Sequence, residues 1–322
     1  MHRWTDPAQT PESLRPCVAT FGNFDGVHRG HRAVLGRLVE EGARHGLPSV
    51  AVTFDPHPAA LFHREKGLPL ITPDTLRDEL LADTGLDGLL VLEFTHEFAD
   101  QTPEDYVVRT FVEALQAKVL VVGEDTRGFG KGYTGDVDLL RELGERHGFE
   151  VVVVNDVGDE GLHRWSSSAV REHLAAGRVG AAASILGRPH QVVGTVVHGA
   201  HRGRDLGYPT ANLDQDALGL VPADGVYAGW LTRLDLPAEH ADRTLPSAIS
   251  VGTNPTFDGT ARTVEAYVLD RTDLDLYDER VAIDFVEHIR PTLRFDSVEE
   301  LLTAMAGDIE QCRQVLKTVV PS

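Results

Sequence analysis

Two histidines near the N-terminus have the type and spacing needed to bind phosphate groups. His28 and His31 lie on either side of Gly30, where a short apolar run ends and a helical pattern begins. A helix N-terminus presents unpaired N–H groups to an anion, and imidazoles can add hydrogen bonds to the charge that develops on a phosphoryl group. The alternative is a glycine-rich turn whose histidines only cap the helix.

A second set of polar side chains lies in the other half of the chain. Thr210 and Asn212 are alternate residues of an extended segment after Pro209, so their side chains point to one face. Two neutral oxygen ligands suit a Mg²⁺ ion that keeps several waters and bridges to phosphates. The preceding glycines and arginines, Gly203 and Arg204 among them, are typical of a phosphate-facing loop. The alternative is a proline turn followed by a strand with two solvated polar residues.

A carboxylate within an apolar strand is the third candidate. Glu265 interrupts the run 264–269, VEAYVL, in which its neighbours are apolar or aromatic. Such a residue either faces outward from the strand or serves as a general base, because a desolvated carboxylate is a stronger proton acceptor. Its sequence leaves both interpretations open.

Composition limits the classes of function. The chain has 322 residues and a formal net charge of -20, with 50 acidic and 30 basic residues. Nucleic-acid backbones require clustered Lys and Arg, so we expect no nucleic-acid partner. No apolar run approaches the roughly 20 residues that span a bilayer, so we expect no membrane partner. Two distant cysteines, Cys17 and Cys312, favour a reducing, cytoplasmic location. The oligomeric state stays open.

The elements that must position these side chains alternate in the first half of the chain. Short apolar runs at 17–21, 49–54, 89–94, 119–122 and 151–154 predict strands. Helical patterns at 30–45, from 103, and at 137–147 lie between them. This alternation indicates a Rossmann-like α/β domain with a parallel sheet, which we place at residues 1–186.

The second half changes character. From residue 191 to about 290, short strands are separated by turns rich in Gly, Pro, Asp and Asn, which predicts an antiparallel β-barrel. A helix over about 298–319 follows, and the domain is expected to span residues 187–322. The segment 176–178, after a helix at 168–175, is interpreted as a linker.

The segment 20–31, TFGNFDGVHRGH, resembles the nucleotidyltransferase signature in the FAD synthetase module of bacterial bifunctional riboflavin kinase/FAD synthetases. Segments 52–58, 123–125 and 164–171 match that module in order. The resemblance implies that ATP adenylylates FMN to FAD with release of pyrophosphate, and that His28 and His31 stabilise the phosphates. It assigns nucleotide binding to Gly22, Asn23, Asp25, Asp125, Arg164, Ser167, Ser168 and Arg171, and flavin binding to Phe54 and His57.

Two of these residues have ordinary structural alternatives. Ser168 can simply cap a helix, and Phe54 can simply pack in the core. The loop after Gly123 also departs from the family pattern, because Thr126 takes an aromatic position and Gly128 is inserted. A kinase whose N-terminal domain binds nucleotide or flavin without adenylylating is therefore the alternative function.

The segment 194–213 resembles the riboflavin kinase signature of the same enzymes, and 222–228, 250–257, 264–270 and 288–291 follow in the family's order. The resemblance implies that this half phosphorylates riboflavin to FMN with ATP. Glu265 would be the base for the ribityl 5′-hydroxyl, and Thr210 and Asn212 would hold the Mg²⁺–nucleotide. It also assigns Gly203, Arg204 and Pro209 to the nucleotide and Arg290 to the flavin.

Three other interpretations of the sequence compete with this one. The segment 130–135, GKGYTG, fits the G-x-G-x-x-G pattern of dinucleotide-binding turns. Its glycines begin several residues past the expected strand end at Val122, whereas such a turn follows its strand immediately, so we predict no dinucleotide site. A flavin-responsive regulator and a nucleotidyltransferase acting on another phosphate ester are the remaining rivals.

Overall fold

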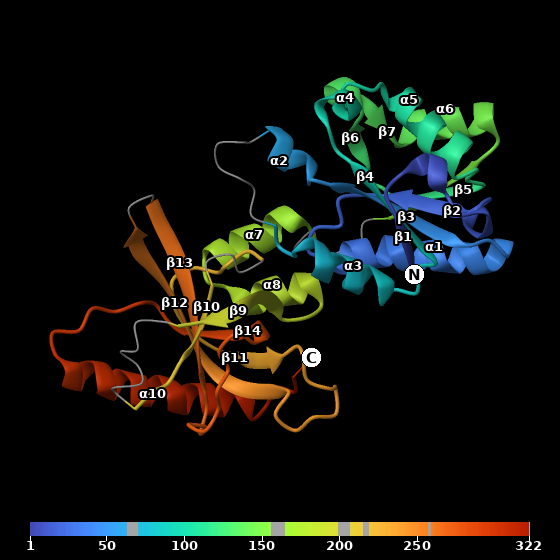
Figure 1. Cartoon of the computed structure of the whole chain (residues 1–322). Coiled ribbons are helices and arrows are strands. Elements are labelled where there is room, and N and C mark those ends of the chain that lie inside the picture. The colour runs from blue at the N-terminus through green and yellow to red at the C-terminus, as the bar shows by residue number, and fades with distance from the viewer. Residues whose placement is uncertain (63–69, 156–164, 199–206, 215–218, 257–258, 322) are drawn as a thin grey trace. The chain divides into compact units, whose positions relative to one another are not determined.

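The computed structural model describes residues 1–62, 70–155, 165–198, 207–214, 219–256 and 259–321. The chain divides into two compact units (Figure 1). One comprises Met1–Pro69 and Asp74–Trp165, and the other comprises Leu70–Pro73 and Ser166–Ser322. Each unit is described by itself below.

A six-stranded parallel sheet forms the centre of the first unit. Its order is β1 (His2–Trp4), β4 (Gly88–Glu93), β3 (Ser49–Asp55), β2 (Val18–Phe21), β5 (Val119–Gly123) and β8 (Glu150–Val154). The inner strands are runs of largely buried residues rich in valine, as expected where both faces of a sheet are covered. Separate apolar clusters fill the two faces. The predicted parallel α/β domain is confirmed.

Helices cover both faces of this sheet. They are α1 (Arg29–His45), α3 (Asp74–Ala82), α4 (His96–Ala99), α5 (Pro103–Val107) with its π-helical continuation Val108–Ala114, and α6 (Val137–His147), whereas the short α2 (Pro58–Phe62) follows β3. Short 3-10 turns occur at Pro7–Gln9, Glu12–Leu14 and Lys131–Tyr133, and a hairpin joins β6 (Arg127–Phe129) to β7 (Gly135–Asp136). Helix α6 has the predicted bounds, because Asp136 caps its first turn and Gly148 ends it with φ of 78°.

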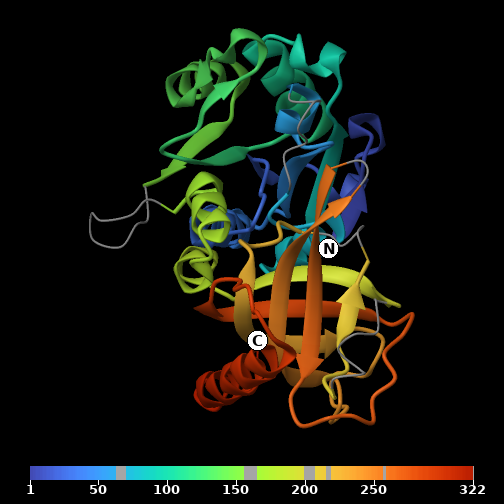
Figure 2. The same ribbon diagram turned by 90° about the vertical axis from the view of Figure 1, so that its left-hand side faces the viewer.

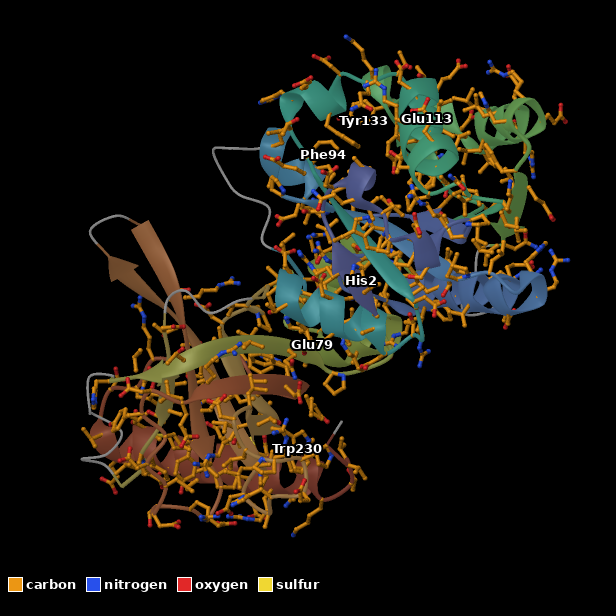
Figure 3. All side chains as sticks on the ribbon, turned by 45° about the vertical axis from the view of Figure 1, so that its right-hand side comes forward. His2, Glu79, Phe94, Glu113, Tyr133 and Trp230 are labelled. Atoms are coloured by element: carbon orange, nitrogen blue, oxygen red, sulfur yellow. The ribbon has the colours of Figure 1, made fainter. Side chains whose placement is uncertain are left out.

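The second unit is built on a closed six-stranded antiparallel barrel (Figure 2). Its strands are β9 (His190–Val197), β10 (Ala211–Leu213), β11 (Gly225–Arg233), β12 (Thr244–Thr256), β13 (Gly259–Val268) and β14 (Arg280–Arg290), in the order β10-β13-β12-β11-β14-β9. The terminal helix α10 (Val298–Leu316) packs Cys312 and Leu316 against Ala228 and Trp230, the last labelled in Figure 3. The predicted barrel and terminal helix are confirmed.

The predicted linker at 176–178 is wrong. This segment is the tight turn between α7 (Ser167–Ala175) and α8 (Val179–Leu186), and the backbone N–H of Gly177 donates to Leu174. Gly177 has φ of 72°, the left-handed conformation that glycine supplies at a helix end. Both helices belong to the same compact unit as the barrel. The domain division at 186/187 stays a prediction.

A buried histidine at the start of β9 makes the barrel sensitive to acid. His190 is 1% exposed, and its Nε2 is hydrogen-bonded to the carbonyl of Leu220 at 2.6 Å. Burial lowers the pKa of His190 from 6.5 to about 4, although the Leu220 hydrogen bond acts in the opposite direction. Between these two values the unfolded chain binds the proton and the folded chain does not. Above pH 6.5 this histidine is neutral in both the folded and the unfolded chain, so its titration does not lower the free energy of unfolding there.

We expect the free energy of unfolding to fall as the pH is lowered from about 6.5 to about 4, by up to about 3 kcal/mol from this group. A His190→Gln variant keeps a donor for Leu220 and removes the titration, so its loss of stability over this range is smaller. Urea unfolding at pH 7 and pH 5 measures the difference. Equal pH slopes in the two proteins would contradict the assignment.

Candidate active sites

The first candidate site lies where the strand order of the sheet reverses, between β2 and β5. In open α/β sheets, ligands bind at the carboxyl ends of the strands at this point. Gly22 and Asn23 follow β2, and Asp125 follows β5. A side chain at Gly123 would place its Cβ 2.9 Å from Asp125 Oδ1 and 3.8 Å from Val34 of α1. The structure therefore brings these predicted nucleotide-binding segments to one edge of the sheet.

His28 and His31 form a stacked pair at the start of α1. His28 is the N-cap residue, and its Nδ1 accepts a hydrogen bond from the backbone N–H of His31 at 3.3 Å. The ring centroids are 3.6 Å apart. A Cβ at Gly30 would lie 3.1 Å from the His28 ring and 3.3 Å from the carbonyl of Trp165. His28 does cap the helix, and the cap fixes both rings at the positive end of the helix dipole, while its contact with phosphate stays a prediction.

The chemistry of His31 follows from its surroundings. Its Nδ1 atom is buried and has no hydrogen-bond partner among the described residues. Burial, and next the neighbouring His28, lower the pKa of His31 well below its ordinary value of 6.5. The ring also meets the edge of Phe24 at 5.3 Å. His31 is therefore a neutral imidazole at neutral pH, which can donate one hydrogen bond but brings no positive charge.

The loop between β2 and α1 is held in an unusual conformation. Phe24 and Val27 have φ of 50° and 40°, and Phe24 is nevertheless buried. A side chain at Gly22 would meet the Phe24 ring at 3.2 Å. The carbonyl of Asn23 accepts a hydrogen bond from the Thr53 hydroxyl at 3.3 Å. Backbone strain of this kind persists where the surrounding structure enforces it, which is common at ligand sites.

Asp25 and Asp125 differ in exposure. Asp25 is 3% exposed, whereas Asp125 lies in an exposed turn that is closed by a hydrogen bond from Thr126 N–H to Gly123 O at 3.0 Å. Asp125 thus lies at the surface near the sheet edge, and its contact with nucleotide stays a prediction. The buried position of Asp25 fits a role in shaping the loop.

The serine-rich segment opens helix α7 in the other compact unit. Ser167 and Ser168 lie in the first turn, with Arg171 one turn further on. The cap is Ser166, whose hydroxyl accepts a hydrogen bond from Ala169 N–H at 3.2 Å, so the capping alternative for Ser168 is wrong. Hydroxyls at a helix N-terminus suit a phosphate ligand. Arg164 lies outside the described residues.

The loop with Thr126 and Gly128 is part of the β6–β7 hairpin. Gly128 and Gly130 have φ of 73° and 71°, and a Cβ at Gly130 would lie 2.6 Å from the backbone nitrogen of Pro103. Phe129 packs inward, 5.3 Å from the Phe21 ring. The glycines of the G-x-G-x-x-G pattern therefore belong to a hairpin well after β5, and a dinucleotide turn between strand and helix is excluded.

An aromatic cluster lies beside this hairpin and includes Phe54. We use the name "aromatic cluster" for Phe21, Phe54, Phe94, Phe98, Tyr106, Phe111 and Phe129. Phe54 is 9% exposed and meets Phe94, labelled in Figure 3, edge to face at 5.5 Å. Core packing therefore describes the observed position of Phe54, and its contact with flavin stays a prediction. His57 immediately precedes α2, and its Nδ1 accepts a hydrogen bond from Ala59 N–H at 3.1 Å.

Sequence reasoning missed the aromatic cluster. Its members come from strands, helices and the hairpin, spread over residues 21–129, and only the fold brings them together. The hydroxyl of Tyr106 is buried there with no hydrogen-bond partner among the described residues. A buried hydroxyl is costly to leave unpaired, so this atom stands out within an otherwise apolar cluster.

The second candidate site lies on β10 and β13 of the barrel. Asn212 is paired directly with Glu265 in the antiparallel register. The Thr210 hydroxyl donates to Glu265 Oε2 at 3.4 Å, and the Asn212 amide donates to the Thr210 carbonyl at 3.1 Å. Ala266 is fully buried in the barrel, so the alternation of the strand places Glu265 on its outer face. The structure thus brings all three predicted residues together.

These three residues supply oxygen ligands only: a hydroxyl, an amide carbonyl and a carboxylate. Hard cations such as Mg²⁺ prefer this chemistry. Burial raises the pKa of Glu265, and the hydrogen bond from Thr210 partly offsets the effect. The Glu265 carboxylate is therefore more basic than an exposed glutamate. In the described part of the chain, no group of three or more His, Cys, Asp or Glu residues could hold a metal.

Arg290 has a structural partner. Its Nε and Nη2 each lie 2.7 Å from an oxygen of Asp308, so a two-pronged ion pair joins β14 to α10. A flavin contact for Arg290 stays a prediction. Pro209 immediately precedes Thr210 in the described chain, whereas Gly203 and Arg204 lie outside the described residues.

Comparison with known proteins covers both units. The family model described as FAD synthetase matches residues 10–169, and the one described as riboflavin kinase matches residues 186–316. The bifunctional riboflavin kinase/FMN adenylyltransferase of Escherichia coli (strain K12) is 37% identical over 308 residues, which are 95% of each chain. Its counterpart in Pseudomonas fluorescens is 37% identical over 306 residues, 94% of each chain.

A crystal structure from Streptococcus pneumoniae, described as a macrolide-efflux protein, has a TM-score of 0.85 and 30% sequence identity. The match spans 97% of the present chain and 98% of the chain in that crystal structure. Within the part of this chain that the structure describes, no helix is both long and apolar enough to cross a membrane.

Proposed function

The chain belongs to the family of bifunctional riboflavin kinase/FMN adenylyltransferases, and on that premise we propose how its two halves divide the chemistry. The barrel half phosphorylates riboflavin to FMN, and the half with the parallel sheet adenylylates FMN to FAD. The direct pairing of Asn212 with Glu265, together with the Thr210 hydrogen bond, is the observation that carries the kinase assignment.

In the kinase step, the ribityl 5′-hydroxyl of riboflavin attacks the γ-phosphorus of ATP, and ADP leaves. Glu265 takes the proton of that hydroxyl, a role that the raised pKa of its carboxyl supports. Thr210 and Asn212 hold the nucleotide with Mg²⁺, for which their oxygen atoms are suitable ligands. The ion, when bound, neutralises charge on the phosphates.

In the adenylyl step, a phosphate oxygen of FMN attacks the α-phosphorus of ATP, and the bond to pyrophosphate breaks. His28 and His31 donate hydrogen bonds to the phosphates at the N-terminus of α1, where the helix dipole favours negative charge. The nucleotide lies at the strand-order reversal between β2 and β5. The flavin ring lies against the aromatic cluster through Phe54, because aromatic faces and edges suit a planar ring.

Purified protein tests both halves. With riboflavin, ATP and Mg²⁺ we expect FMN and ADP, and with FMN, ATP and Mg²⁺ we expect FAD and pyrophosphate, each separated by chromatography. FMN formation without FAD or pyrophosphate would refute the adenylyl half. Absence of any FMN from riboflavin would refute the kinase half and favour a flavin-responsive regulator.

A second candidate function is riboflavin kinase alone, with an N-terminal unit that binds nucleotide or flavin. Thr126 and Gly128 favour it, because they alter the loop next to Asp125. Against it, Phe129 of the same loop packs on Phe21 in the aromatic cluster. We propose that the protein acts in the cytoplasm, since Cys17 and Cys312 are both buried free thiols.

A further inference from the structure

A buried arginine outside the sequence motifs supports the end of strand β3. Arg77 lies in α3, and its side chain is only 3% exposed. Its Nη1 donates to the backbone carbonyl of Phe54 at 3.3 Å. The same nitrogen lies 2.9 Å from Asp74 Oδ1, and Nη2 lies 3.3 Å from Asp78 Oδ1. The guanidinium thus joins two carboxylates of its own helix to the strand that carries Phe54.

The two carboxylates explain why a charge is tolerated at this depth. An isolated buried cation would be strongly destabilising, and it persists only when paired and hydrogen-bonded. Asp74 and Asp78 supply that compensation from within α3. The remaining contact of the guanidinium, to Phe54, is therefore the one that reaches out of the helix. Its planar group offers five donors in a fixed arrangement, which suits several partners at once.

The carbonyl of Phe54 needs a donor that the sheet does not supply. Pairing between β2 and β3 ends at Phe21 and Val52, and the last ladder bond runs from Gly22 N–H to Val52 O at 3.0 Å. Phe54 lies two residues further on. On the β4 side, the next carbonyl, that of Asp55, accepts from Phe94 N–H at 3.0 Å. Because buried backbone carbonyls are almost always paired, Arg77 replaces a missing strand neighbour.

The held carbonyl belongs to the residue whose ring enters the aromatic cluster. Phe54 meets Phe94, Phe98 and Tyr106 at ring-centroid distances of 5.5, 5.8 and 6.3 Å. We propose that Arg77 is a positioning residue for the adenylyl step, which fixes the backbone of Phe54 so that its ring presents a defined surface to the flavin ring of FMN. This inference rests on the proposed function, in which FMN lies against the aromatic cluster.

The test compares Arg77→Met, Arg77→Lys and a control, Arg3→Gln, in the full chain. The Arg3 side chain is 45% exposed, and its Nε lies 2.8 Å from Oδ2 of Asp78, the carboxylate that also pairs with Arg77. We expect Arg77→Met to raise the KM for FMN in FAD formation about tenfold, which corresponds to one lost interaction of moderate strength. The KM for ATP and the kcat change less than about threefold. Arg77→Lys recovers part of the loss, and Arg3→Gln behaves as wild type.

A second readout separates positioning from general damage. Quenching of FMN fluorescence on binding to the protein should weaken in parallel with the KM, while FMN formation from riboflavin stays at the wild-type rate. An unchanged KM for FMN, or equal losses toward ATP and FMN, would overturn the inference. If Arg77→Met fails to fold, the lysine variant decides by the same criterion. Failure of the wild-type protein to make FAD would refute the proposed function instead.

Discussion

The variant His28→Asn/His31→Leu forms FAD from FMN about 10³-fold more slowly than wild type and forms FMN from riboflavin at the normal rate. Removing one preorganised donor to developing charge typically costs a factor of 10² to 10³, and paired donors are not additive. Asparagine at position 28 is chosen because His28 caps α1, and asparagine is a favourable cap. Leucine at position 31 fills the space of the buried imidazole next to Phe24 and has no hydrogen-bond donor.

Measurement of both products in one preparation keeps this result interpretable, because the barrel serves as the internal control for folding. His45→Gln is the matched substitution on the same helix: His45 lies at the far end of α1, 3.6 Å from Glu41. It should leave both activities unchanged. Loss of FMN formation together with FAD formation, in a double variant that still unfolds cooperatively, would contradict the proposed division of the two steps.

The variant Glu265→Gln has the opposite effect. FMN formation from riboflavin falls by about 10² to 10⁴-fold, the usual contribution of a positioned general base. Glutamine keeps the size of the side chain and can still accept the hydrogen bond from Thr210. FAD formation from supplied FMN continues at the wild-type rate, because the proposed adenylyl step uses His28 and His31 at the start of α1 and not Glu265. Glu287→Gln, an exposed carboxylate on β14, is the control and should be silent.

The pH dependence of the kinase step gives an independent measurement. Burial raises the pKa of the Glu265 carboxyl, and only the ionised form accepts a proton from riboflavin. The kcat/KM for riboflavin should therefore fall as the pH is lowered through a pKa above the ordinary glutamate value, and this acidic limb should disappear in Glu265→Gln. An acidic limb retained in the variant would assign the base to another group.

Elements with a strong local pattern could be predicted from the sequence. The alternating strands and helices, and bounds such as those of α6, depend on hydrophobic periodicity and on caps such as Asp136, which act over a few residues. Strand β1 has no such pattern, because His2–Trp4 is too short to show a period and is a strand only through its pairing with β4. Composition alone does not distinguish the turn at Gly177 from a linker, since a glycine at a helix end and a flexible segment contain similar residues.

By itself, the sequence determined the fold class, the two sets of motifs and the family, because residue types at fixed local spacing carry that information. Only the tertiary structure decided which side chains meet. It placed Glu265 opposite Asn212 through strand register, assigned His28 as the cap of α1, and engaged Arg290 with Asp308. It also placed the Arg77 guanidinium against the backbone carbonyl of Phe54 and brought the members of the aromatic cluster together. Such contacts depend on packing between segments far apart in the chain, and no local spacing specifies them.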